Sequence, residues 1–140
     1  MRYLLDTNVL SEAVKTAPHR HVMAMMHTHQ EEIVTAAPVY HELEYGCRRL
    51  PISQKRDIIE LYIKNVILQH MVILPYDERA AQWHAQERAR LTAQGRTAPF
   101  VDGQIAAIAK VNGLTLVTRN TSDFENFSSV EVQNWHTPDE

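Results

Sequence analysis

Four acidic residues stand where a predicted strand ends or a predicted helix begins, and carboxylates in such places can do chemistry together. They are Asp6, Glu42, Asp102 and Asp123, from well-separated parts of the sequence. Carboxylates that meet at one place repel one another, and hard divalent cations such as Mg²⁺ and Mn²⁺ are their usual partners. Such ions activate a water molecule and stabilise the oxygens of an in-line phosphoryl displacement. The four acids therefore suggest metal-assisted hydrolysis of a phosphate ester.

The neighbours of Asp6 allow two interpretations. The apolar run Tyr3–Leu5 predicts a buried parallel strand, and Asp6 stands where that strand meets solvent. In open α/β sheets the ligand crevice lies at the carboxyl ends of the strands, which would place Asp6 at its mouth. Asp6 is equally suited to a helix N-cap, as are Thr7 and Asn8. The other acids have to separate these two interpretations.

Apolar runs alternate with amphipathic segments along the chain. Strands are predicted at 3–5, 33–37, 71–74 and 114–117, with a short edge strand at 130–132. Helices are predicted at 11–14, 19–30, 38–50, 53–68, 77–91 and 99–112. Such alternation predicts a three-layer α/β/α fold with a central, mostly parallel sheet of four to five strands. We expect a single domain over residues 1–140.

In this fold the acids share one edge of the sheet. Glu42 and Asp102 are expected in the first turns of helices, beside Asp6 and the turn that contains Asp123. Glu44 lies about 200° around its helix from Glu42, so the two cannot serve one site. Gly46, four residues after Glu42, costs the helix about 0.5–1 kcal/mol relative to alanine. We therefore expect another part of the molecule to approach Gly46 closely.

Composition narrows the class of protein. A formal net charge of −3 argues against a protein that holds nucleic acid through bulk positive charge, although an enzyme with a local basic patch is compatible with it. The single cysteine, Cys47, cannot form an internal disulfide, which is typical of a reducing compartment. No apolar run approaches the roughly 20 residues of a membrane span. We expect a cytoplasmic protein with no membrane association.

The histidine pairs of the predicted helix 19–30 raise the question of zinc. His19 and His21 are two residues apart, as are His27 and His29. Residues at that spacing point to different sides of a helix, and no further histidine or cysteine with closed spacing follows. A solvated or packed helix is therefore the favoured interpretation.

Four motifs together resemble one protein family. They are Leu4-Leu-Asp-Thr-Asn8, Glu42-Leu-Glu-Tyr-Gly46, Val101-Asp-Gly-Gln-Ile-Ala-Ala-Ile-Ala109 and Leu116-Val-Thr-Arg-Asn-Thr-Ser-Asp-Phe124. In this order they resemble the PIN domain, and more narrowly the VapC-type toxins of bacterial toxin–antitoxin pairs. The resemblance implies an Mg²⁺- or Mn²⁺-dependent endoribonuclease that hydrolyses RNA. It also implies a small cognate antitoxin as partner and a homodimer.

The resemblance also implies roles for particular residues. Asp6, Glu42 and Asp102 match the metal-binding acids of the family. Asn8 and Thr118 match polar residues that orient the first acid and the site water.

The position after Thr118-Arg119 departs from the family pattern. Many members have a fourth acid there, and this chain has Asn120. An amide oxygen can bind a hard cation or its water but adds no charge, and Asp123 could supply the missing carboxylate. We expect Asn120, Asp123 or both to complete the catalytic set, with Asp123 as the metal ligand. Arg96 and Arg119 are the candidates for contacts with RNA phosphates.

Three other classes of protein are alternatives to a PIN-domain ribonuclease. A haloacid-dehalogenase-like phosphatase would need a second acid two residues after Asp6, where this chain has Asn8. A receiver-type signalling domain would need an acid pair near its first strand and a late lysine, and neither is evident. A catalytically weak PIN-fold protein that acts by binding RNA or a partner would account for Asn120.

Overall fold

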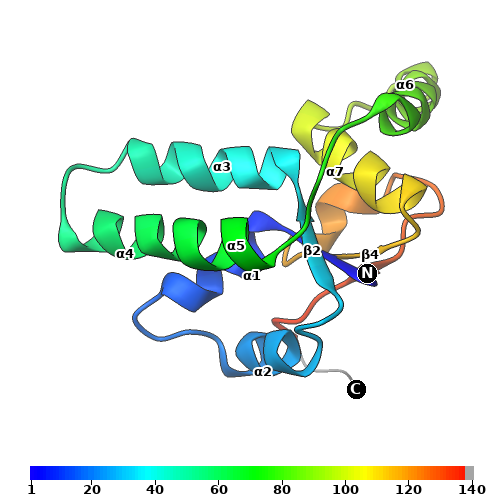
Figure 1. The fold of residues 1–140 in the computed structure, drawn as a ribbon. Coiled ribbons are helices and arrows are strands. Elements are labelled where there is room, and N and C mark those ends of the chain that lie inside the picture. The colour runs from blue at the N-terminus through cyan, green and yellow to red at the C-terminus, as the bar shows by residue number, and fades with distance from the viewer. Residues whose placement is uncertain (138–140) are drawn as a thin grey trace.

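A five-stranded parallel sheet forms the centre of the molecule (Figure 1). A computed structural model describes residues 1–137. The strands are β1 (Tyr3–Leu5), β2 (Ile33–Ala36), β3 (Ile73–Leu74), β4 (Thr115–Val117) and β5 (Val132–Gln133). Their order is β3-β2-β1-β4-β5, and every neighbouring pair is parallel. The predicted α/β/α class is confirmed, with five strands.

Helices lie on both sides of this sheet (Figure 1). They are α1 (Thr7–Leu10), η1 (Ser11–Val14), α2 (Arg20–Thr28), α3 (Ala37–Arg48), α4 (Gln54–Tyr62), η2 (Ile63–Ile67), α5 (Leu68–His70), α6 (Glu78–Ala93), α7 (Phe100–Val111) and η3 (Thr121–Phe124). The predicted helix 53–68 is one continuous run of α4, η2 and α5, with a π-helical turn at η2. Ser53 and Asp77 cap α4 and α6 through side-chain oxygens that accept from backbone N–H groups, which fixes where these helices begin.

The register of the central strands aligns their carboxyl ends. Leu5 of β1 is paired with Val117 of β4, and the Asp6 amide donates to the Val117 carbonyl at 2.9 Å. The residues that follow these strands, Asp6 and Thr118, therefore lie side by side. The parallel register explains how residues 112 positions apart in the sequence reach the same place.

Part of the core is packed between the sheet and α7. Leu4, Leu5 and Leu116 of the two central strands are fully buried, as are four of five consecutive residues in Ile105–Ala109, with Ile105 at 1% exposure. Full burial of a leucine or isoleucine side chain contributes about 1.5–3 kcal/mol. The alanines among them let α7 approach the sheet closely, so the helix that carries Asp102 is held firmly.

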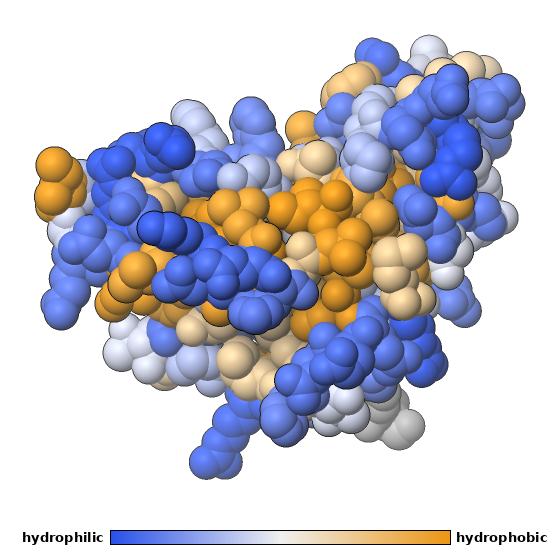
Figure 2. Space-filling view, viewed as in Figure 1, coloured by the Kyte–Doolittle hydropathy of each residue, from blue (hydrophilic) through white to orange (hydrophobic). Residues whose placement is uncertain are grey.

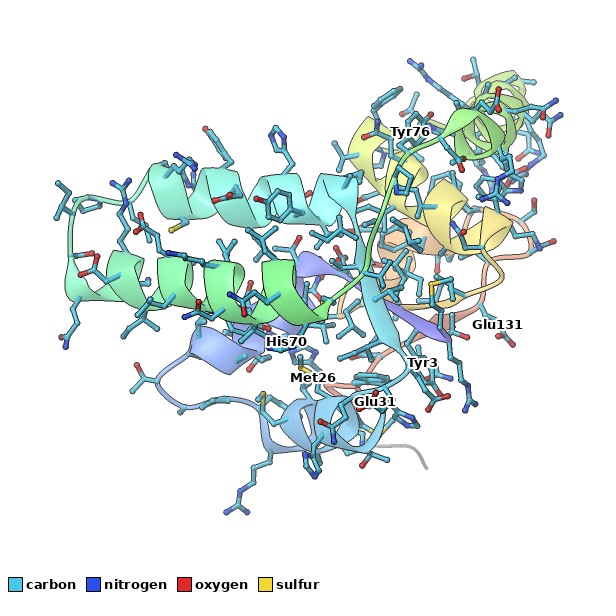
Figure 3. All side chains as sticks on the ribbon, viewed as in Figure 1. Tyr3, Met26, Glu31, His70, Tyr76 and Glu131 are labelled. Atoms are coloured by element: carbon cyan, nitrogen blue, oxygen red, sulfur yellow. The ribbon has the colours of Figure 1, made fainter. Side chains whose placement is uncertain are left out.

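The C-terminal tail packs against α2. Trp135 is 2% exposed, and its ring lies 5.2 Å from that of Tyr3 and 5.8 Å from that of His29. Figure 3 labels Tyr3 near Met26 and Glu31, which belong to α2 and the loop that follows it. Trp135 thus packs against the face of β1 that carries Tyr3.

Four strands differ from the predicted bounds. β2 ends at Ala36 rather than Ala37, and β4 begins at Thr115 rather than Leu114. β3 begins at Ile73 rather than Met71, because the Met71 amide still donates to the Ile67 carbonyl of the preceding helix. β5 covers Val132–Gln133, not 130–132. Across residues 1–137, no helix has the length and apolar character required to cross a membrane.

Candidate active site

Asp6 satisfies both interpretations drawn from the sequence. It follows β1 and caps α1, because Oδ1 accepts a hydrogen bond from the Thr7 amide at 2.8 Å. Oδ2 accepts from the Thr118 hydroxyl at 2.8 Å. Asp6 is only 7% exposed, so its orientation is fixed by these two donors and by the packing around it.

Asn8 and Thr118 fasten the polar turn after β4 to the end of β1. The Asn8 amide nitrogen donates to Thr118 Oγ1 at 3.3 Å, and Asn8 Oδ1 accepts from the Arg119 amide at 2.9 Å. The Asn120 amide also donates to Thr118 Oγ1 at 3.1 Å. This network ties the carboxylate of Asp6 to the backbone that leads into η3.

Glu42 reaches the same edge from a different part of its helix than expected. It is the sixth residue of α3 and so lies in the second turn, because α3 begins at Ala37, directly after β2. Glu42 Oε2 accepts from the Thr7 hydroxyl at 2.9 Å. Glu44 accepts instead from the Tyr40 hydroxyl at 2.6 Å, as expected for a residue on another side of the helix.

The pKa values of two acids reveal a shared field of negative charge. Burial raises the pKa of Asp102 to about 6, and repulsion from Asp123, Asp6 and Glu42 adds to the rise. Burial also raises the pKa of Asp6, against the hydrogen bond from Thr118, with Glu42 and Asp123 again contributing. Asp102 is therefore repelled by the other three acids, and Asp6 is repelled by Glu42 and Asp123.

Asn120 and Asp123 differ in what they contribute. The Asn120 backbone begins η3 and donates to Thr118, while no hydrogen bond of its side chain is found within residues 1–137. Asp123, in the first turn of η3, repels both Asp6 and Asp102. Because only Asp123 adds negative charge near the other acids, it is the better candidate for the fourth carboxylate.

The glycine at which another group approaches closely is Gly103 and not Gly46. A Cβ atom built on Gly46 would have no heavy atom within 4 Å, so the expectation for Gly46 was wrong. A Cβ on Gly103 would lie 2.2 Å from Nε2 of His84, which is 4% exposed and packed against α7. The position of Gly103 beside Asp102 was the available signal, and the sequence analysis missed it.

A sequence model of the PIN domain matches residues 3–130. The chain belongs to the PIN domain family. Among its curated relatives, the toxin FitB of Neisseria gonorrhoeae is 33% identical and covers 95% of this chain and 98% of its own length. The tRNA(fMet)-specific endonuclease VapC of Shigella flexneri is 29% identical and covers 96% of this chain and 98% of its own length. Membership removes the phosphatase and receiver alternatives.

Solved structures agree with this PIN assignment. FitAcB from Neisseria gonorrhoeae has a TM-score of 0.86 at 34% identity, over 95% of this chain and 97% of that chain. DNA-bound VapBC from Salmonella typhimurium has a TM-score of 0.84 at 26% identity, over 96% of this chain and 98% of that chain. The predicted fold and the resemblance to VapC-type toxins are both confirmed.

The chemistry of the PIN acids fits a hard divalent cation. Their donors are carboxylate oxygens, and the raised pKa values of Asp6 and Asp102 reflect negative charge that a cation would neutralise. In the part of the chain that the structure describes, no three His, Cys, Asp or Glu side chains are already arranged to hold an ion. The carboxylates would therefore have to move towards a bound cation.

A groove of about 1090 Å³ opens beside Glu42, between η1, α3 and α4. Its apolar lining includes Val14, Leu43, Leu50, Ile58, Ile59 and Tyr62. Its cationic side chains are Lys15, Arg49 and Lys55, and Glu42 is its carboxylate. The hydroxyl of Tyr62 is buried without a hydrogen-bond partner among residues 1–137, and burial raises the pKa of this tyrosine to about 12. The groove offers an apolar floor with a mainly positive margin.

Proposed function

We propose that this PIN domain is a divalent-metal-dependent endoribonuclease and acts as the toxin of a toxin–antitoxin pair. The observation that carries the proposal is a set of four neighbouring carboxylates at the carboxyl edge of a parallel sheet, in which Asp102 is repelled by the other three. Structural roles alone do not account for such repulsion, since it opposes folding. The ribonuclease and toxin names of full-length relatives support the same reaction class.

Each acid has a role in this proposal. Asp6, Glu42 and Asp102 would hold Mg²⁺ or Mn²⁺ directly or through water, with Asp123 or Asn120 completing the set. Such an ion supplies a water of lowered pKa for attack on the scissile phosphate. Thr118 holds the Asp6 carboxylate in place through its hydroxyl. The main chain of Arg119 is anchored by Asn8, which leaves its exposed guanidinium available to a phosphate.

The cognate antitoxin is proposed to dock in the groove between η1, α3 and α4. The groove has an apolar floor and a mainly basic margin, so an amphipathic segment with acidic residues would complement it. Such a segment would lie directly beside Glu42 and block access to the acids. Ile58→Glu is expected to leave RNA cleavage intact and weaken inhibition by the antitoxin; unchanged inhibition would remove the groove as the docking site.

A homodimer is also proposed, because large apolar side chains remain exposed. Leu68 and Val72 are 50% and 53% exposed. Figure 2 shows a broad hydrophobic patch across the middle of the face seen in that view. Apolar patches of this kind often mark protein interfaces. Light scattering of the purified protein checks the expectation, and a monomer at all concentrations would contradict it.

The test of the nuclease is cleavage of a mixed RNA pool by antitoxin-free protein. Cleavage is expected with Mg²⁺ or Mn²⁺ and is expected to stop with EDTA. Asp6→Asn is expected to remove cleavage while circular dichroism shows an intact fold, which also excludes a contaminating nuclease. Cleavage activity retained by a folded Asp6→Asn protein would show that the proposed site is wrong.

A catalytically weak PIN protein that binds RNA or a partner is the second candidate. The observation in its favour is Asn120, an amide where many relatives of this type carry an acid. A folded wild-type protein that binds metal and RNA but cleaves nothing would establish this alternative. Restored cleavage in Asn120→Asp would then identify the missing charge as the cause.

A further inference from the structure

A small second pocket lies between the C-terminal half of α6 and the loop that leads into α7. Its volume is about 270 Å³, slightly below the roughly 300–1,000 Å³ of sites for drug-sized ligands. The polar side chains that line it are those of His84, Arg88, Thr92, Arg96 and Thr97. No carboxylate is among its lining residues. The protein has a net charge of −3, but this pocket is lined only by cationic and neutral groups. Such a lining favours the binding of an anion.

Both guanidinium groups of this pocket lack an acidic partner. On the same helix, Arg79 pairs with Asp77 at 3.2 Å and Arg90 pairs with Glu87 at 2.9 Å. Within residues 1–137, neither Arg88 nor Arg96 has a carboxylate within 4.0 Å. Their positive charge is therefore available to a ligand.

Neutral contacts hold these two arginines at the pocket. The Arg88 guanidinium lies over the exposed ring of Phe100, 5.2 Å from its centre. Arg96 donates to Asn126 Oδ1 at 3.1 Å. A guanidinium that is already oriented loses less side-chain entropy when it binds an oxyanion.

His84 forms the buried wall of the pocket. It is 4% exposed and shares a hydrogen bond of 2.8 Å with the hydroxyl of Tyr76 through Nδ1. Figure 3 labels Tyr76 in the segment that joins β3 to α6. Nε2 of His84 lies against Gly103 of α7, so the ring is held between Tyr76 and α7 and gives the pocket a rigid, neutral wall.

The pocket is close in the chain to Asp102, because the loop that lines the pocket leads directly into α7. Ala98 lines the pocket, and Asp102 follows it by four residues, a stretch that spans at most about 14 Å even when fully extended. A short single-stranded segment of RNA covers such a distance. A phosphate bound in the pocket would thus belong to the same RNA molecule as a scissile phosphate at the acids.

We propose that the pocket between α6 and α7 binds a backbone phosphate of the RNA substrate at a position away from the scissile bond. Arg88 and Arg96 supply the charge, the threonine hydroxyls supply further hydrogen-bonding groups, and His84 forms a wall of the pocket. The pocket positions the RNA and is not part of the hydrolytic step. This assignment rests on the proposed ribonuclease function.

The test separates binding from catalysis by measuring both. Arg88→Gln and Arg96→Gln replace exposed side chains, and Arg79→Gln on the same helix is the matched control outside the pocket. Fluorescence anisotropy of a labelled single-stranded RNA, in EDTA to prevent cleavage, gives the affinity at several salt concentrations. Each pocket variant is expected to bind about five- to tenfold more weakly, and the slope of log affinity against log salt should fall by about 0.7.

Steady-state cleavage with Mg²⁺ or Mn²⁺ gives the second measurement. The pocket variants are expected to raise KM and leave kcat close to that of the wild type, whereas Arg79→Gln changes neither. Cleavage with unchanged KM, together with an unchanged salt slope, would overturn the pocket and leave the nuclease intact. If RNA binding depends on the two arginines but the protein never cleaves RNA, the pocket is supported and the nuclease function is overturned.

Free inorganic phosphate is the other ligand that could bind to the two arginines of the pocket. Inorganic phosphate is added to the anisotropy assay, with chloride at equal ionic strength as control. Competition that disappears in Arg88→Gln and Arg96→Gln supports the pocket as the shared site. Stabilisation of the fold by inorganic phosphate, with RNA affinity insensitive to both variants, would assign the pocket to a free anion and overturn the RNA proposal.

Discussion

Asp102 has the largest pKa shift among the four acids of the site. Its folded pKa of about 6 lies above the ordinary value of 3.8, so the folded state binds more protons between these two pH values. The charge therefore lowers the stability of the metal-free protein at pH 7, and this cost declines as the pH falls from about 6 towards 3.8. The full shift corresponds to about 3 kcal/mol, which solvent screening of this partly exposed group reduces to about 1 kcal/mol.

Asp102→Asn is accordingly expected to stabilise the metal-free protein at pH 7 by about 1 kcal/mol. The gain should shrink as pH falls and vanish below about pH 4, where the wild-type carboxylate is protonated in both states. Urea denaturation in EDTA at pH 7 and pH 4 measures both values. A variant less stable than the wild type at pH 7 would show that Asp102 is held by favourable contacts instead. Cleavage should be lost in the same variant.

Asp123 and Asn120 give a second prediction for single residues. Asp123 repels Asp6 and Asp102, while Asn120 adds no charge, so Asp123→Asn should lower metal-dependent cleavage by about tenfold or more. Asn120→Ala serves as the matched control and should remain within about threefold of the wild type. The reverse order of effects in the cleavage assay would identify Asn120 as the fourth ligand.

At the scale of elements, the contact between α6 and α7 sets the position of Asp102. His84 of α6 occupies the space that a side chain on Gly103 would need. Gly103→Ala is therefore expected to lower the free energy of unfolding by about 1–3 kcal/mol, because either His84 or α7 must shift. It should also reduce cleavage, since Asp102 precedes Gly103 on the same helix.

Gly46→Ala is the matched control in the interior of α3. A new Cβ there meets no atom within 4 Å, so the substitution should stabilise the protein by about 0.5–1 kcal/mol through the helix propensity of alanine. Chemical denaturation of both variants measures the difference. Equal effects of the two substitutions would show that the His84 contact does not constrain α7.

At the scale of the whole molecule, Glu12 joins the N-terminal helical segment to the C-terminal tail. Its carboxylate accepts from Lys15, from the His19 amide at 2.9 Å, and from His136 Nε2, which lies 3.2 Å away. Burial alone would raise the pKa of Glu12, but these contacts outweigh it and hold the pKa at about 2. The ionised carboxylate therefore stabilises the fold at neutral pH.

Glu12→Gln is expected to destabilise the protein at pH 7 by on the order of 2–3 kcal/mol. Because the pKa rises from about 2 in the folded state to the ordinary 4.5 on unfolding, the stabilisation is complete above about pH 5. It is lost as pH falls towards 2, so the two proteins should converge there. Glu31→Gln, an exposed residue after α2, should change stability by less than about 0.5 kcal/mol. A constant difference between wild type and Glu12→Gln from pH 7 to pH 2 would falsify this account.

The sequence by itself determined the α/β/α class and the helix starts at Ser53 and Asp77. It also determined that Asp6 and Asp102 lie at the same carboxyl edge of the sheet. Each of these depends on local chemistry: apolar periodicity, capping side chains, and polar residues directly after a strand. Local signals also indicated that Glu44 would lie apart from Glu42, because helix geometry fixes that angle.

Only the tertiary structure decided which groups meet across the chain. The hydrogen bond from the Thr7 hydroxyl to Glu42 joins residues that are 35 positions apart in the sequence. Gly46 and Gly103 both lie inside predicted helices, and the packing of α6 on α7 decides that the close contact is at Gly103. The pocket of Arg88 and Arg96 likewise requires α6 and the following loop to fold back together. Long-range packing sets these positions, and no local pattern in the chain encodes it.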